Sequence, residues 1–293
     1  MTIGHVNWKL FTPIWSKCNL CNESTTNRGV LVSMNGKSYR LNRIFRPDTG
    51  NTVILPVDHS ISLGAVPGLE DPIGVLTHLS HAGVDGILLN DGLNTHADAV
   101  FTGRNTPARI VNADCFYEDG QGITHGQINW PELAVRKGYD AIKVLLLWDQ
   151  PAASRMENVK MLAAMVREAE KWELPVMIEP TTVHPVSDLQ TKIALLSDAT
   201  RVAYELGADI LKVSHPGNSA TLTTWCNQYK VPLILLGGGL AGDTEQVISL
   251  VSEAINIGVR GVAIGRNVWQ RPQEESERVL RAFVNVIHRD NRP

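Results

Sequence analysis

Eight short apolar stretches, recurring along the chain from residue 52, constrain its fold more than any other feature. Each is apolar over nearly its whole length and rich in Val, Ile and Leu, as expected for a parallel strand covered on both faces. They span residues 52–57, 84–89, 108–113, 140–148, 174–179, 208–214, 231–237 and 259–265. The pattern therefore predicts a parallel β-sheet of eight strands.

Segments with helical periodicity separate most of these stretches. The clearest span residues 154–173, 188–207, 243–258 and 275–290. Several segments end in a glycine suited to the left-handed position after a helix, namely Gly138, Gly207 and Gly258. Eight strand–helix units over about 240 residues predict a single (β/α)8 TIM barrel. An open, doubly wound sheet is the alternative, but the even spacing favours closure.

The first 50 residues lack this alternation of strand and helix patterns. We expect an N-terminal extension over residues 1–50 and a barrel domain over 51–293. Asn35-Gly36 is a turn signal and predicts a short hairpin around residues 30–41. Cys18 and Cys21 form a C-x-x-C motif, which zinc sites and redox pairs use. Because no second ligand pair follows, an unspecialised arm is the favoured interpretation.

Charge and hydropathy exclude several classes of protein. The chain has 27 Lys and Arg against 30 Asp and Glu, a net charge of −3, so we expect no nucleic-acid partner. It has no run of about 18 apolar residues that would span a bilayer, and its first residues do not resemble a secretory signal. We therefore expect a cytoplasmic protein without a membrane partner.

Charged side chains stand within or directly after four of the apolar stretches: Asp58, Lys143, Glu179 and Lys212. In TIM barrels the catalytic residues lie at the C-terminal ends of the strands. A desolvated lysine loses its proton more readily and then forms Schiff bases with carbonyl substrates. A buried ion pair without a catalytic role is the alternative for a lone lysine. Four such residues in one barrel favour an active site instead.

Glycines follow the last two predicted strands, where TIM barrels often bind phosphate. For Gly237–Gly239 a simple tight turn is the alternative, but Gly265-Arg266 after the neighbouring strand favours an anion site. The predicted phosphate and substrate contacts are Gly238, Gly239, Gly265, Arg266, His59 and His215. Asp149 and His184 are weaker candidates. The spacing typical of zinc proteases is absent, so we expect no metal ligands.

These motifs resemble a known family. ILPVDHS, GADILKVSHPG, LGGGLAGD and AIGRNVWQR are similar to the class I aldolases of the DeoC/LacD/DhnA superfamily. RLNRIFRPDTGNTVILPVDH resembles the branch that holds archaeal-type fructose-bisphosphate aldolases and an autoinducer-2-phosphate thiolase. The resemblance covers about residues 40–290. It implies that Lys212 forms the Schiff base, that Asp58 handles protons or orients hydroxyls, and that the glycines and Arg266 hold a phosphate.

The sequence also departs from that branch. Thr181 stands where archaeal aldolases carry a proton-donating tyrosine, and Ser60 where a glycine usually follows the Asp-His pair. DAIKVLLLWD and LPVMIEPTT instead resemble tagatose-bisphosphate and sulfofructose-phosphate aldolases. In those enzymes a lysine and a glutamate, matching Lys143 and Glu179, serve the active site. This combination of motifs from two branches leaves the identity of the substrate more open than the type of reaction.

We therefore expect a metal-independent class I aldolase, a lyase with no cofactor besides the imine on Lys212. Its expected partners are a phosphorylated ketose or ketone and an aldehyde. Glu179 or Asp58 would move the proton of the β-hydroxyl, and Lys143 would favour the neutral amine of Lys212 or orient Glu179. The resemblance implies a homo-oligomer, as large as a decamer. Thiolase-like acyl transfer and an inactive phosphosugar-binding sensor are the alternative functions.

Overall fold

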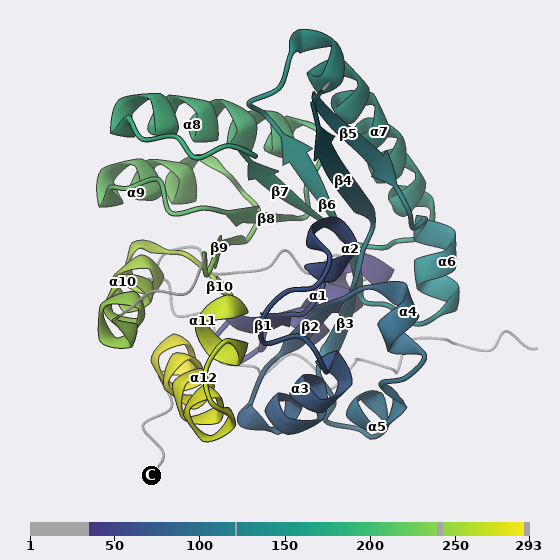
Figure 1. The fold of residues 1–293 in the computed structure, drawn as a ribbon, viewed down its shortest axis with the longest axis vertical. Coiled ribbons are helices and arrows are strands. Elements are labelled where there is room, and N and C mark those ends of the chain that lie inside the picture. Colours follow the sequence, from purple (N-terminus) through teal and green to yellow (C-terminus); the bar gives the residue numbers. More distant parts are fainter. Residues whose placement is uncertain (1–34, 121, 239–242, 290–293) are drawn as a thin grey trace, which may run out of the picture.

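Eight parallel strands close into a barrel in the computed structural model, which describes residues 35–120, 122–238 and 243–289 (Figure 1). The order around the barrel is β1-β10-β9-β8-β7-β6-β3-β2. The strands are β1 (Thr52–Pro56), β2 (Gly86–Leu89), β3 (Ala108–Asn112), β6 (Ala141–Leu147), β7 (Val176–Thr181), β8 (Ile210–Val213), β9 (Leu233–Leu236) and β10 (Gly261–Ala263). Closure confirms the predicted (β/α)8 barrel and excludes the open sheet.

Helices surround the barrel, and the four clearest predictions are confirmed as α7, α8, α10 and α12 (Figure 1). The helices outside the barrel wall are α2 (Ser60–Leu63), α3 (Pro72–Leu79), α4 (Asp91–Asn94), α5 (Asp98–Phe101), α6 (Pro131–Arg136), α7 (Ala152–Lys171), α8 (Leu189–Glu205), α9 (Ser219–Gln228), α10 (Thr244–Ile257), α11 (Arg266–Trp269) and α12 (Gln273–His288), with a 3-10 turn at Ser80–Ala82. Within the described ranges, none of these helices is long and apolar enough to cross a membrane.

The hairpin predicted around residues 30–41 is wrong, because its second half belongs to helix α1 (Gly36–Ile44). The Asn35 side chain accepts a hydrogen bond from the backbone N–H of Ser38 and so caps the helix instead of opening a turn. Ile44 and the following Phe45 are buried in the lower barrel interior. Residues 30–34 lie outside the described residues, as do Cys18 and Cys21.

Ion pairs tie α1, and Arg46 two residues beyond its end, to the N-terminal end of the barrel. Each pair joins a basic residue to an aspartate just before a strand: Lys37 to Asp209, Arg43 to Asp140, and Arg46 to Asp85. Oδ2 of each aspartate also accepts a hydrogen bond from a backbone N–H of the neighbouring strand, at Val176, Arg109 and Val53 respectively. The division of the chain at residue 50 stays a prediction, and α1 packs on the barrel that follows it.

An antiparallel hairpin, which the sequence pattern did not predict, stands between β3 and α6. Its strands are β4 (Asp114–Asp119) and β5 (Gly122–Gln127). In Figure 1 the hairpin rises beside β6 and α7, at the edge of the barrel. Asp119-Gly120, at the end of β4, is a turn signal that would have revealed it.

The barrel interior is filled at its N-terminal end by a layer of apolar side chains. It consists of Ile54, Leu88, Ala108, Ile110, Ala141, Met177, Ile210, Ile234 and Ala263, with Ile44 and Phe45 beneath them. Because side chains alternate along a strand, the next inward-facing residues lie two positions further on. That second layer holds the candidate site.

Candidate active site

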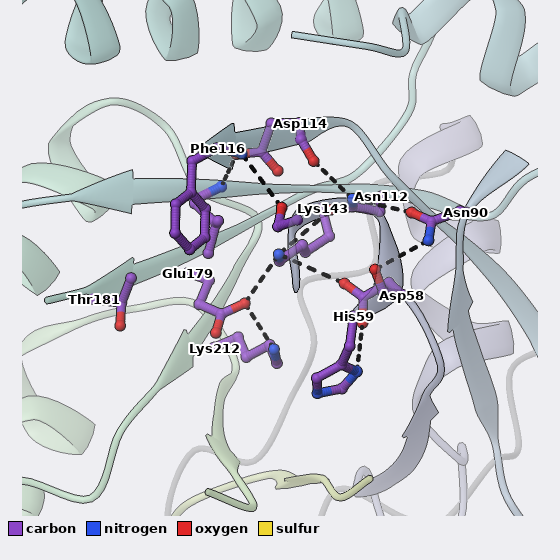
Figure 2. A network of polar contacts seen from close by, with 12 residues as sticks. Asp58, His59, Asn90, Asn112, Asp114, Phe116, Lys143, Glu179, Thr181 and Lys212 are labelled. Carbon is purple, nitrogen blue, oxygen red and sulfur yellow. Dashed lines mark hydrogen bonds and ion pairs between the residues drawn. The ribbon is translucent and has the colours of Figure 1, made fainter. Parts of the chain in front are cut away.

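The second interior layer is polar on five of the strands, in contrast to the apolar layer below it. Two positions after Leu88, Ile110, Ala141, Met177 and Ile210 come Asn90, Asn112, Lys143, Glu179 and Lys212. Asp58, just beyond β1, completes the group (Figure 2). Strand periodicity therefore places six polar side chains together at the C-terminal end of the barrel, where TIM-barrel enzymes have their active sites.

One carboxylate oxygen of Glu179 is shared by two lysines (Figure 2). Nζ of Lys212 donates to Oε2 of Glu179 at 2.7 Å, and Nζ of Lys143 lies 3.2 Å from the same oxygen. The exposed fractions are small, 4% for Lys143, 7% for Lys212 and 9% for Glu179. Buried charges are stable only when they are paired, and here both lysines are paired with the same carboxylate.

Lys143 lies at the centre of the polar layer. Besides Glu179, its Nζ lies 3.7 Å from Oδ2 of Asp58 and donates to Oδ1 of Asn112 at 3.4 Å. The Asn112 side chain in turn donates to Asn90, and Asn90 donates to the backbone carbonyl of Asp58. The layer is thus a connected network. The structure brings together all four residues predicted to be catalytic.

These contacts hold both charges in their ionised forms. Burial alone would raise the pKa of the Glu179 carboxyl, but the ammonium groups of Lys212 and Lys143 lower it to about 2. Burial would lower the pKa of Lys143, whereas the carboxylates of Glu179, Asp58 and Asp114 raise it far above its ordinary value. At neutral pH Glu179 is therefore an acceptor and Lys143 a cation.

His59 lies at the boundary between this network and the predicted phosphate region. Its Nδ1 is 3.6 Å from Oδ1 of Asp58, and its ring packs edge-on against Trp269 with centroids 5.3 Å apart. Burial lowers the pKa of His59, and the charges of Lys212 and Arg266 lower it further against the opposing effect of Asp58. The imidazole is therefore neutral at physiological pH and lies within electrostatic range of Lys212 and Arg266.

A hydrogen bond from Nδ2 of Asn267 to the carbonyl of Gly237, at 2.7 Å, joins the loops after β9 and β10. At Gly265 a Cβ would lie 2.9 Å from Nε1 of Trp269 and 3.0 Å from the carbonyl of Pro56, so only glycine fits. Gly238 has a φ of +66°, which also favours glycine. Nε of Arg266 is buried and has no hydrogen-bond partner among the described residues. Gly239 lies outside them.

Other predicted residues lie apart from the lysine network. His215 bonds its own loop, where its Nδ1 accepts from the backbone N–H of Gly217 at 3.1 Å. His184 bridges Asp149 and Glu118 at 3.1 Å and 3.0 Å, and this cluster is largely exposed. Among the described residues, no group of three or more His, Cys, Asp and Glu side chains is arranged to hold a metal ion.

Sequence reasoning missed Asn90 and Asn112, which connect Lys143 to Asp58. A signal for them existed, since Asn90 directly follows the second apolar stretch and Asn112 stands near the end of the third. An uncharged asparagine at such a position is a weaker indication of a functional site than a charged residue. Its amide nevertheless satisfies both a cation and a carbonyl, which suits a buried network.

Comparison with known proteins identifies the family of this chain. The sequence model of the DeoC/LacD family aldolases matches residues 52–271, three quarters of the chain. The chain belongs to the DeoC/LacD aldolase family. The predicted resemblance to the class I aldolase superfamily is therefore confirmed.

Two relatives of this aldolase are synthases. One is 2-amino-3,7-dideoxy-D-threo-hept-6-ulosonate synthase of Halobacterium salinarum, 29% identical over 88% of this chain and 94% of the relative. The other is 2-amino-4,5-dihydroxy-6-oxo-7-(phosphonooxy)heptanoate synthase of Streptomyces griseus, 27% identical over 80% of this chain and 85% of the relative. A solved structure of a Schiff-base-forming fructose-1,6-bisphosphate aldolase is 25% identical, covering 86% of this chain and 100% of its own, with a TM-score of 0.70.

Proposed function

We propose that this aldolase makes or breaks a C–C bond through an imine on Lys212, without a metal ion. Nζ of Lys212 attacks the ketone carbon of the substrate, and loss of water gives a protonated imine. In the cleavage direction the β-hydroxyl loses its proton and the bond between the α and β carbons breaks. An aldehyde leaves, and the electron pair passes through the enamine toward the imine nitrogen. Protonation of the α carbon and hydrolysis return the ketone and Lys212.

The observation that carries this proposal is the buried contact of 2.7 Å between Lys212 and Glu179. Glu179 is ionised at neutral pH, so it accepts hydrogen bonds from the attacking amine and from the substrate hydroxyl. Glu179 or Asp58 would take the β-hydroxyl proton and return it, as general base and then general acid. Lys143 contacts both carboxylates and would orient them.

A phosphorylated ketose or ketone is the substrate class that we propose. Backbone N–H groups at Gly238, Gly239 and Gly265 would bind the phosphate, and Arg266 would add a charged contact. His59 would contact the substrate between the phosphate and Lys212, and His215 would reach it from the loop after β8. The Nε of Arg266 supports this assignment, because a buried guanidinium nitrogen that finds no partner among the described residues is costly.

The names of the two synthases support a carbonyl donor and an aldehyde acceptor. The product named for the Streptomyces griseus relative carries a ketone at position 6, a phosphate at position 7 and hydroxyls at positions 4 and 5. A hydroxyl two carbons from a ketone is the pattern that an aldol addition forms. We propose the same reaction class for this chain, in either direction.

Borohydride trapping tests the proposal. The protein is incubated with a panel of phosphorylated ketoses and ketones, reduced with sodium borohydride, digested and examined by mass spectrometry. We expect a stable adduct on the peptide containing Lys212, with parallel loss of activity. Lys212→Arg, which keeps the charge, should give no adduct, whereas Lys230→Arg on the protein surface should leave trapping intact. An adduct on Lys143, or none with any ketone, would contradict the assignment.

The two alternative functions receive less support. A phosphosugar sensor needs no pair of buried lysines around a carboxylate, an arrangement that is costly to maintain. Thiolase-like acyl transfer gives Glu179 no evident task. We further propose that the protein acts in the cytoplasm as a homo-oligomer, as large as a decamer. Sedimentation velocity at several protein concentrations measures that assembly, and a single monomer boundary would exclude it.

A further inference from the structure

The β4–β5 hairpin has an inverted pattern of burial. Its most buried residue is a carboxylate, Asp114, at 1% exposed, whereas Tyr117 on the same strand is 57% exposed. A segment that served only packing would bury the ring and expose the charge. Asp114 instead lies next to the polar layer (Figure 2), so the hairpin adds a charge to the site from outside the barrel wall.

Two strong hydrogen bonds fix the Asp114 carboxylate. Its Oδ2 accepts from Nε2 of His125 on β5 at 2.6 Å and from the backbone N–H of Leu145 on β6 at 2.7 Å. Its Oδ1 has no hydrogen-bond partner among the described residues, although the side chain is fully buried. Burying such a charge is costly, and hydrogen bonds satisfy only one of its two oxygens.

Asp114 is linked to Lys143 by two structural routes. Leu145, to which it is anchored, follows Lys143 by two residues on β6. Asn112 donates to the backbone carbonyl of Asp114 at 2.7 Å and accepts from Nζ of Lys143 at 3.4 Å. A shift of Asp114 would therefore disturb both the strand that carries Lys143 and the Asn112 amide that Lys143 contacts.

The charges facing Lys143 come from four elements. Glu179 on β7, Asp58 beyond β1 and Asp114 on β4 are negative, and Lys212 on β8 is positive. The imidazole of His125 on β5 contacts Asp114, so any charge on it would act on Lys143 through Asp114. Among these charges, that of Asp114 is the one supplied by the hairpin. Its attraction raises the pKa of Lys143, together with the attractions of Glu179 and Asp58 and against the effect of burial.

We propose that Asp114 and His125 are positioning residues for the reaction proposed above. The hydrogen bond from His125 fixes the Asp114 carboxylate, which anchors β6 at Leu145. The negative charge of Asp114 adds to those of Glu179 and Asp58 in keeping Lys143 an ammonium. The inference rests on the proposed function only for its kinetic consequence. The ionisation of Lys143 itself needs no substrate.

Nuclear magnetic resonance of protein labelled with ¹³C-lysine measures that ionisation directly. The Cε resonance of Lys143 is identified by its loss in Lys143→Arg and followed as the pH rises. Asp114→Asn keeps the size and removes the charge, so we expect Lys143 to begin titrating at least about one pH unit lower than in the wild type. Asp119→Asn, at the exposed end of the same strand, should leave the titration unchanged. An unchanged titration in Asp114→Asn would overturn the proposal.

Kinetics of two His125 variants test the positioning role. His125→Phe removes the donor to Asp114 and should lower kcat at least about tenfold with little change in KM. His125→Gln supplies an amide N–H and should restore most of the loss, with the pH profile of kcat kept. Equal losses in both variants would mean that His125 titrates or relays protons, and would overturn the positioning role. So would wild-type kcat in His125→Phe.

The two proposals can fail separately. Absence of a borohydride adduct on wild-type Lys212 would reject the proposed function, whatever the Lys143 titration gives. If Lys143 titrates at the same pH in Asp114→Asn as in the wild type, the inference about the hairpin is rejected, even if Lys212 is trapped efficiently.

Discussion

Oε2 of Glu179 lies 2.7 Å from Nζ of Lys212 and 3.2 Å from Nζ of Lys143, so one oxygen atom serves two cations. Because the oxygen is shared, a change in the charge of one lysine alters the interaction of the other lysine with Glu179. In the proposed reaction Lys212 would become an imine and its hydrogen bond to Glu179 would change, while Lys143 would still hold the carboxylate. Under this proposal one lysine reacts and the other keeps Glu179 in place.

Glu179→Gln should separate imine formation from C–C bond cleavage. The amide cannot accept the β-hydroxyl proton, so we expect kcat to fall by about 10²- to 10⁴-fold, the usual contribution of a general base. Borohydride trapping on Lys212 should persist, because attack on the ketone leaves Lys212 as the nucleophile. Turnover and trapping are measured on the same preparation. Full activity in Glu179→Gln would transfer the proton-moving role to Asp58.

Acid should remove the stability that Glu179 contributes. Its pKa is lowered from 4.5 to about 2 in the folded protein, so its contribution is complete above about pH 4.5 and is lost as the pH falls toward 2. At pH 7 we expect Glu179→Gln to lower the free energy of unfolding by about 3 kcal/mol. Urea unfolding at pH 7, 5, 4 and 3 should show this difference shrinking below pH 4.5. A constant difference would contradict the pairing.

Arg266→Ala should weaken binding of the phosphorylated substrate and leave the chemical step nearly intact. Loss of a charged contact to phosphate predicts a KM raised about ten- to hundredfold with kcat almost unchanged. A substrate analogue without the phosphate should be used equally well by both proteins. Arg281→Ala, which removes an exposed arginine paired with Glu277 on α12, is the control and should leave KM unchanged. A fall in kcat alone would place Arg266 elsewhere in the mechanism.

Arg46→Ala should reduce stability without altering catalysis. It leaves the nearly buried Asp85 carboxylate without its arginine, which predicts a loss of about 3 kcal/mol in the free energy of unfolding. Arg136→Ala breaks an exposed pair with Glu132 and should cost less than about 1 kcal/mol. Denaturant unfolding and steady-state kinetics are compared for both variants. A changed kcat in Arg46→Ala would show that the two ends of the barrel are coupled.

The barrel and four polar residues of its interior could be predicted from the sequence because their signals are local. A strand buried on both faces is apolar throughout, so Lys143 and Lys212 stand out against it. His125 carries no such signal, since only the fold of the hairpin brings it to Asp114. Asn35-Gly36 suits both a hairpin turn and a helix start. Burial of Ile44 and Phe45 inside the barrel decides between them, and that is a tertiary effect.

The ion pairs between α1 and the strand starts have a practical consequence for handling the protein. Tyr39 on α1 is 61% exposed and belongs to the end of the barrel opposite to Lys212. A chemical tether attached there would orient the molecule with its reactive end toward the solution. Immobilisation through α1 should therefore preserve access of substrate to the barrel mouth, whereas a tether at Tyr117 on the hairpin would obstruct it.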